Sequence, residues 1–110
     1  MIMRATRQLL AIALFAAATG AAAEEDAAVL SKGAGCNLCH HASQAMLGPS
    51  WQAIAERYRG DDNAAALLAR RVREGSKGVW GEAKMMPTPE EKLDEAELDR
   101  VIAWVLNRQG

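Results

Sequence analysis

Two cysteines and a histidine stand together in the segment Cys36-Asn37-Leu38-Cys39-His40. Cysteines three residues apart lie on one face of a helical turn, so both thiols can add to the two vinyl groups along one edge of a porphyrin. The histidine that follows is then held next to the iron. The pattern therefore predicts covalent haem c, one per chain, attached through Cys36 and Cys39 and bound axially by His40.

Three other chemistries use cysteines at this spacing. A thioredoxin-like redox pair needs a βαβ context, for which the chain has no pattern. A zinc site needs four ligands, and the adjacent His40 and His41 are poorly placed to share one tetrahedron with the two cysteines. A disulfide between Cys36 and Cys39 remains an alternative, although a loop this short gives little entropic stabilisation.

Haem iron bound by one histidine has a second axial position, which electron-carrying haem proteins fill with methionine. Beyond the first 23 residues the chain has three methionines: Met46, Met85 and Met86. Met46 lies six residues from His40 and is hard to bring to the opposite face of a haem. Met85 and Met86 lie in a loop with no evident core of its own, so we expect the second ligand there.

Residues 1–23 differ in composition from the rest of the chain. Arg4 and Arg7 precede the apolar run 9–18, and the small residues Ala21-Ala22-Ala23 come before the acidic Glu24. This order predicts a secretory signal peptide, residues 1–23, because the apolar run is too short to span a bilayer. Removing it leaves one domain, residues 24–110, with no membrane span, and the expected location is the periplasm.

The charge of the chain excludes general nucleic-acid binding. Thirteen basic and fourteen acidic residues leave a formal net charge of -1, so no basic field can neutralise a phosphate backbone. Without Arg4 and Arg7 the mature chain is more acidic still. We therefore expect a small, mildly acidic domain, in which the haem also serves to stabilise the fold.

The elements that must position these residues are predicted to be helices. Asp94 as N-cap, Glu97 three residues later and apolar residues at 3-and-4 spacing predict a helix over 94–106. A second helix is expected from Asp61-Asp62 to a stop at Gly75, and shorter ones near 26–32 and 51–58. Segment 75–89 is too rich in glycine and proline for regular structure, and no strand pattern is found.

With these pieces in place, the chain resembles the small bacterial class I cytochromes c, in particular the short monohaem periplasmic proteins that donate electrons to nitrite reductases and terminal oxidases. The resemblance covers essentially all of residues 25–110. It rests on the Cys36–His40 motif, Leu47-Gly-Pro49, the segments 71–81 and 85–89, and Trp104-Val-Leu106, in the family's order. It implies an all-α fold of about four to five helices wrapped around one covalently attached haem.

The resemblance also implies roles for individual residues. Cys36 and Cys39 form the thioethers, His40 is the proximal iron ligand, and the carbonyl of Pro49 accepts the Nδ1 proton of that histidine. Arg71 and Trp80 match positions that contact a haem propionate by charge and by the indole N–H.

The distal ligand is where the sequence departs from the family, whose common form is Met-Pro-Pro. Alignment from Trp80 without a gap makes Met85 the ligand, and alignment on the Met-Pro pair makes it Met86. Met85 is preferred, because Trp80 constrains the upstream side whereas the loop after the methionines is longer here. His41 is expected to be an exposed surface residue that does not bind iron.

The resulting hypothesis is a monomeric electron shuttle that does no bond chemistry on a substrate and is not an enzyme. Its partners would be redox proteins bound transiently, such as a cytochrome complex as donor and a nitrite reductase or terminal oxidase as acceptor. The alternative is a haem c sensor or enzyme with an open distal site, for which the chain supplies no distal acid–base pair.

Overall fold

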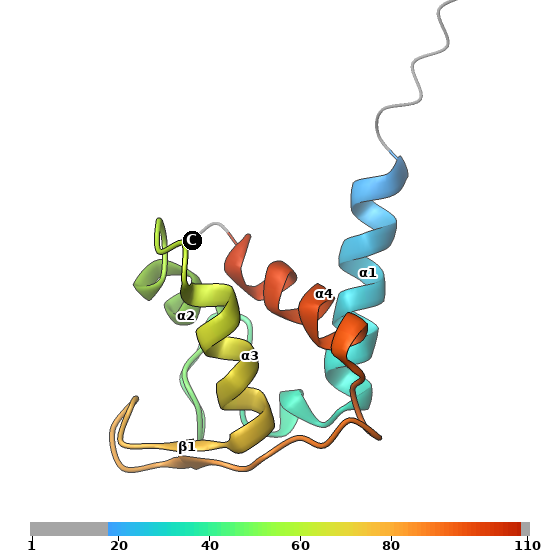
Figure 1. The fold of residues 1–110 in the computed structure, drawn as a ribbon. Helices are drawn as coiled ribbons and strands as arrows, with labels where there is room; N and C mark the ends of the chain where they lie inside the picture. The colour runs from blue at the N-terminus through green and yellow to red at the C-terminus, as the bar shows by residue number, and fades with distance from the viewer. Residues whose placement is uncertain (1–17, 109–110) are drawn as a thin grey trace, which may run out of the picture.

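Residues 18–108 are described by a computed structural model, and they form a mostly helical fold (Figure 1). In chain order the elements are α1 (Ala18–Gly33), the 3-10 turn η1 (Cys36–Leu38), α2 (Trp51–Arg57), α3 (Ala64–Glu74), β1 (Ser76–Lys77), β2 (Lys84–Met85) and α4 (Glu95–Leu106). Four α-helices in these residues agree with the all-α class expected from the sequence.

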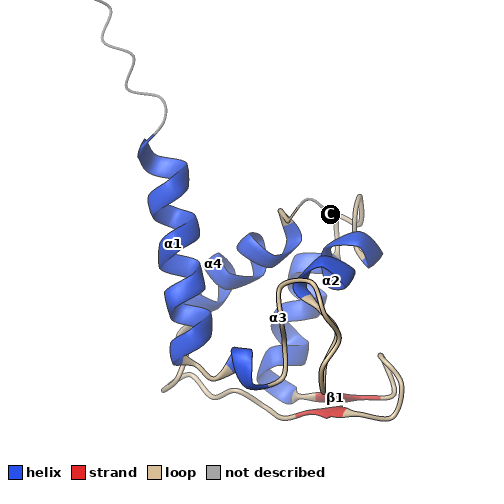
Figure 2. Ribbon diagram, turned by 180° about the vertical axis from the view of Figure 1, so that it is seen from behind, coloured by secondary structure: helices blue, strands red, loops and turns tan. Residues whose placement is uncertain are grey.

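Helix α4 is the element on which the other helices pack. Its N-terminus carries the predicted capping box: the Asp94 carboxylate accepts from the Glu97 amide at 2.8 Å, and the Asp94 amide donates to the Glu97 carboxylate at 3.0 Å. Its buried face consists of the residues expected from the 3-and-4 spacing, Leu98, Val101, Ile102 and Val105. This face contacts α1, α2 and α3, and therefore forms the centre of the core (Figure 2).

Helix α1 is longer than the predicted stretch 26–32, because it begins at Ala18 and continues through the expected cleavage point after Ala23. The alanine-rich segment before Glu24 has high intrinsic helix propensity, which explains the extension. Ala27 and Ser31 are fully buried one turn apart, so α1 meets α4 with small side chains. The signal peptide remains a prediction, and residues 1–17 of it lie outside the described residues.

Local hydrogen bonds determine the first residues of α2 and α3. The Ser50 hydroxyl accepts from the Ala53 amide at 3.0 Å and caps α2. The expected start of the next helix at Asp61-Asp62 is wrong by two to three residues, since the Asp61 carboxylate accepts from the Asn63 amide at 2.9 Å and forms a turn there. Helix α3 ends at Glu74, before Gly75, as predicted.

Segment 75–89 is not entirely irregular, contrary to the prediction. β1 and β2 pair antiparallel, with Ser76 opposite Met85 and Lys77 opposite Lys84. Strands of two residues are too short to produce an alternating sequence pattern, which is why none was visible. The pairing places Met85 beside Ser76, and therefore close in space to the C-terminal end of α3.

Within residues 18–108 no helix is both long enough and apolar enough to cross a membrane.

The buried cluster joins α4 to side chains from the other helices and from the segments that flank them, including Trp51, Ile54, Tyr58, Leu68 and Leu93.

Candidate functional site

The two cysteines lie on a tight turn that follows α1. The carbonyl of Cys36 accepts hydrogen bonds from the amides of Cys39 and His40, at 3.2 Å and 3.0 Å. Both thiols are free and half-buried. One short segment, the turn and the residue after it, therefore carries two free thiols and a histidine, as the motif predicts.

The His40 imidazole is fixed in the protein by contacts on three sides. Its Nδ1 donates to the Pro49 carbonyl at 2.7 Å, which is the hydrogen bond expected from the resemblance. One ring face stacks on Trp51, with centroids 4.4 Å apart and planes at 20°. A methyl group at Gly48 would lie only 2.6 Å from the imidazole Cε1, so the backbone there approaches the ring closely. Neither Trp51 nor Gly48 was assigned a role from the sequence.

This arrangement leaves His40 suited to bind a metal. Because Nδ1 carries the proton, the lone pair is on Nε2, and no hydrogen bond within residues 18–108 engages that atom. Burial lowers the pKa of His40 below its ordinary value, and the bond to the Pro49 carbonyl opposes this shift. The neutral, metal-binding form of the ring is therefore favoured. A neutral imidazole nitrogen that can bind iron, next in sequence to two free thiols that can form thioethers, fits the haem c predicted from the motif.

The close approach of Gly48 leads to a first prediction. Gly48→Ala would place a methyl group against a ring that cannot move away, because Trp51 and Pro49 hold it. We expect the free energy of unfolding to fall by about 2 kcal/mol, the usual cost of an extra methyl group in a packed site. Denaturation by guanidinium chloride measures the effect.

Gly33→Ala is the matched control, since a methyl group there meets nothing within 4 Å. An equal, small effect of both substitutions would show that the His40 ring is free to shift and is not held by its surroundings.

The segment that contains Met85 and Met86 is held against the end of α3. The Thr88 amide donates to the Val72 carbonyl at 2.7 Å, and Arg73 donates from Nη1 to the Thr88 carbonyl at 3.2 Å. Met85 is half-buried in β2, whereas Met86 is 73% exposed. Met46, the third candidate from the sequence, is 52% exposed in the loop before Pro49.

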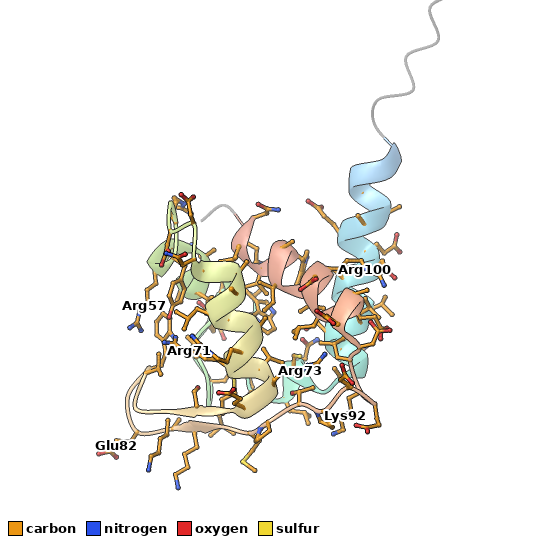
Figure 3. All side chains as sticks on the ribbon, viewed as in Figure 1. Arg57, Arg71, Arg73, Glu82, Lys92 and Arg100 are labelled. Atoms are coloured by element: carbon orange, nitrogen blue, oxygen red, sulfur yellow. The ribbon has the colours of Figure 1, made fainter. Side chains whose placement is uncertain are left out.

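Arg71 and Trp80 are each engaged by a residue that the sequence did not single out. Arg71 donates from Nη1 to the Tyr58 hydroxyl, and the Arg57 guanidinium stacks on the Trp80 ring at 4.4 Å. Arg57 also donates to the Val79 carbonyl at 3.0 Å and so ties the hairpin to α2. Figure 3 shows Arg57 and Arg71 on the same side of the molecule, and Arg73 near the end of α3 that meets the hairpin.

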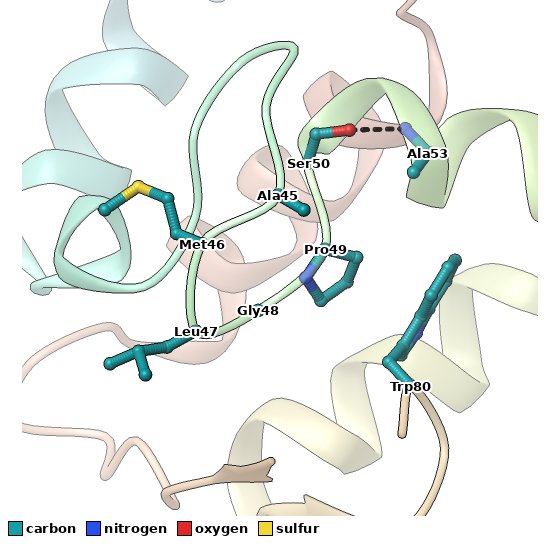
Figure 4. A pocket seen from close by; sticks show the side chains of 8 residues that line it. All are labelled: Ala45, Met46, Leu47, Gly48, Pro49, Ser50, Ala53 and Trp80. Atoms are coloured by element: carbon teal, nitrogen blue, oxygen red, sulfur yellow. Dashed lines mark hydrogen bonds between the residues drawn. The ribbon is translucent and has the colours of Figure 1, made fainter. Parts of the chain in front are cut away.

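A small hollow separates Trp80 from the loop that carries Pro49 (Figure 4). Its lining is mostly apolar and consists of Ala45, Met46, Leu47, Gly48, Pro49, Ser50, Ala53 and Trp80. Trp80 faces Pro49 across it, while the side chains of Met46 and Leu47 extend away from Trp80. The loop that fixes His40 and the predicted propionate residue Trp80 thus border one space.

His41 is exposed, as expected, and does not join His40. Its Nδ1 accepts hydrogen bonds from the amides of Ser43 and Gln44, at 3.1 Å and 3.2 Å, so the ring caps the turn that follows it. The sequence prediction placed it on the surface but missed this local capping contact.

Comparison with known proteins agrees with this geometry. The Cytochrome c family model matches residues 24–109. The chain is 47% identical over 79 residues to cytochrome c2 of Rubrivivax gelatinosus, covering 72% of this chain and 93% of that protein. It is 38% identical over 85 residues to cytochrome c-551 of Pseudomonas aeruginosa, covering 77% of this chain and 79% of that protein.

Among solved structures, wild-type cytochrome c552 of Nitrosomonas europaea is similar, with a TM-score of 0.65 at 35% identity. The match covers 73% of this chain and 96% of that one.

Proposed function

The chain belongs to the cytochrome c family, and from this premise we propose that it is a periplasmic carrier of single electrons that donates to a terminal reductase or oxidase. Members of the family carry one covalently attached haem c, and this chain is an electron carrier and not an enzyme.

The observation that carries the assignment is the 2.7 Å hydrogen bond between His40 Nδ1 and the Pro49 carbonyl. It selects the tautomer with a free Nε2 and makes that nitrogen a better donor to iron. Cys36 and Cys39, half-buried on the adjacent turn, are proposed to form the thioethers. Pro49 acts through His40 and makes no bond to the metal.

Met85 is proposed as the distal ligand, with Met86 as the alternative. Met85 is the last residue of β2, and Met86 follows it with 73% of its surface exposed. The half-buried Met85, paired with Ser76, is the one whose side chain is turned toward protein. Its thioether sulfur is a soft ligand that raises the reduction potential.

Arg71 and Trp80 are proposed to hold a haem propionate. The hydrogen bond to Tyr58 uses one N–H of the Arg71 guanidinium, and four further donors remain for a carboxylate. The Arg57 guanidinium over Trp80 fixes the indole plane and adds positive charge beside it. A carboxylate enclosed here would have charged and neutral donors from two elements.

When bound, haem c supplies an iron that alternates between the ferrous and ferric states. The residues of the chain would keep the cost of that change low by holding His40 and Met85 in place and by excluding water with apolar side chains. Partners would approach over exposed apolar residues near the cysteine turn and the methionine segment: Leu38, Met46, Leu47 and Met86. An apolar patch of modest size favours brief contact and fast release.

Optical spectra of the protein matured in a periplasm test this function. We expect sharp reduced haem c bands together with the near-infrared sulfur-to-iron band of the ferric protein. Haem bands without the sulfur band would favour the alternative, a sensor or enzyme with an open distal site. A colourless protein would leave only thiol or disulfide chemistry for Cys36 and Cys39.

The choice of partner needs a second measurement. The ferrous protein is mixed with a periplasmic nitrite reductase or with a terminal oxidase, and its reoxidation is followed by stopped flow. Rapid reoxidation by either enzyme supports the proposed respiratory role. If neither enzyme reoxidises the protein, the role is contradicted.

A further inference from the structure

Arg73 differs from the other arginines of α3 in what its guanidinium contacts. Arg70 is exposed, and Arg71 donates to Tyr58, the residue that follows α2. Arg73 is half-buried and donates to the backbone carbonyl of Thr88, three residues after Met85. Its charge therefore acts on the main chain of the methionine segment.

The second terminal nitrogen of this guanidinium, Nη2, is enclosed by protein. It is buried and has no hydrogen-bond partner within residues 18–108. A buried donor without a partner is costly, so packing between α3 and the methionine segment must hold the group there. Shielding from water also strengthens the bond that Nη1 makes with the Thr88 carbonyl.

The same stretch of backbone is fixed at both ends. Upstream, Met85 pairs with Ser76 in the two-stranded ladder. Downstream, the Thr88 amide donates to the Val72 carbonyl at 2.7 Å, next to the Arg73 contact. Only two residues lie between Met85 and Thr88, so both methionines are tied to the end of α3. Any opening of this segment away from the site must break the Arg73 contact.

We propose that Arg73 is a positioning residue for the methionine segment and that it controls how readily an external ligand displaces the distal thioether. The inference rests on the proposed function, since it presupposes haem c ligated from residues 85–86. It holds for either methionine, because Thr88 lies downstream of both.

Imidazole titration of the ferric haem-loaded protein tests the proposal, with loss of the near-infrared sulfur band as the signal. In Arg73→Gln we expect imidazole to bind about tenfold more tightly than in the wild type, the effect of losing one charge-assisted hydrogen bond from the closed state. Arg73→Lys retains a cation that can donate to the Thr88 carbonyl and should recover part of the difference. Arg70→Gln removes the same charge from an exposed site of the same helix and should bind imidazole as the wild type does.

Amide hydrogen exchange gives a second readout that does not use the iron. The Thr88 amide should exchange about tenfold faster in Arg73→Gln, because opening the segment also frees the bond to Val72. Amides in the middle of α4 should keep their protection, which separates local opening from general loss of stability.

The outcomes distinguish this inference from the function on which it rests. A wild-type protein that lacks the sulfur band would overturn both. A wild-type protein with the band, but with unchanged imidazole affinity and unchanged Thr88 exchange in Arg73→Gln, would overturn the role of Arg73 alone. If Arg73→Gln does not mature, Arg73→Lys decides: imidazole affinity and Thr88 exchange that both rise above the wild type by less than tenfold, with α4 amides still protected, support the role, and wild-type values of both readouts contradict it.

Discussion

Replacing Met85 with alanine should abolish the near-infrared sulfur band of the ferric protein and lower its reduction potential, whereas replacing Met86 should leave both in place. Met85 is half-buried in β2, and Met86 is 73% exposed on the next residue of the chain. β2 ends at Met85, so it is burial that separates the two thioethers, and only that of Met85 is partly covered by protein. Loss of a methionine ligand removes its contribution to a high potential. Near-infrared spectra and redox titration measure the two effects.

Met46→Ala is the matched control, because it removes a methionine that is 52% exposed in the loop before Pro49. We expect its spectrum to be unchanged. If the band disappears in Met86→Ala and persists in Met85→Ala, the second alignment is correct and Met86 is the ligand. If all three variants keep the band, no single one of these methionines is the ligand.

Gly75→Ala should have the largest effect on stability, with a loss of about 3 kcal/mol in the free energy of unfolding. The residue has φ 77° and ψ 176°, a conformation that is open essentially to glycine alone and costs other residues roughly 1–3 kcal/mol. An added methyl group would also lie 2.6 Å from the carbonyl oxygen of Met85 and 3.1 Å from Pro87 Cδ. Overpacking of this kind costs a further ~1–3 kcal/mol. Guanidinium denaturation of the haem-loaded protein measures the loss.

Gly78→Ala separates the two causes. Gly78 also has a positive φ, 73°, but a methyl group there meets nothing within 4 Å. We expect about half the loss found for Gly75→Ala, and no change in imidazole affinity, because a methyl group at Gly78 meets no atom of the methionine segment. Equal losses at the two positions would mean that the close approach of Gly75 to the segment of Met85 does not contribute to the loss in free energy of unfolding.

Gly75 also marks the limit of what the sequence predicts about this turn. A glycine after an amphipathic helix predicts that the helix stops, and α3 does stop at Glu74. A left-handed cap, in which glycine commonly ends a helix, is not formed here, because ψ is 176° and the chain continues directly into β1. The reason is tertiary: the close pairing with the segment of Met85 requires an extended exit from the helix.

Local patterns predicted several of the interactions that span only a few residues, although not the turn at Asp61 that delays the start of α3. The capping box of Asp94 and Glu97, the buried face of α4 and the cysteine turn all follow from neighbours in the sequence. The hydrogen bond from His40 to Pro49 was also expected, from the resemblance to class I cytochromes c. Such features need only the correct spacing, because the chain is too short between the partners to place them elsewhere.

The contacts that orient the site join residues far apart in the sequence. Trp51 against His40, Arg57 over Trp80 and Tyr58 beside Arg71 each required the packing of α2 and α3 against the loops. The same is true of Arg73 and Thr88. No spacing rule relates such residues, because their distance is set by how helices pack on α4. The sequence by itself thus determined the haem-attachment motif, the helical class and the two candidate distal methionines. Only the tertiary structure decided which methionine is buried and which side chains hold it and His40 in place, because burial and orientation depend on the neighbours that folding brings together.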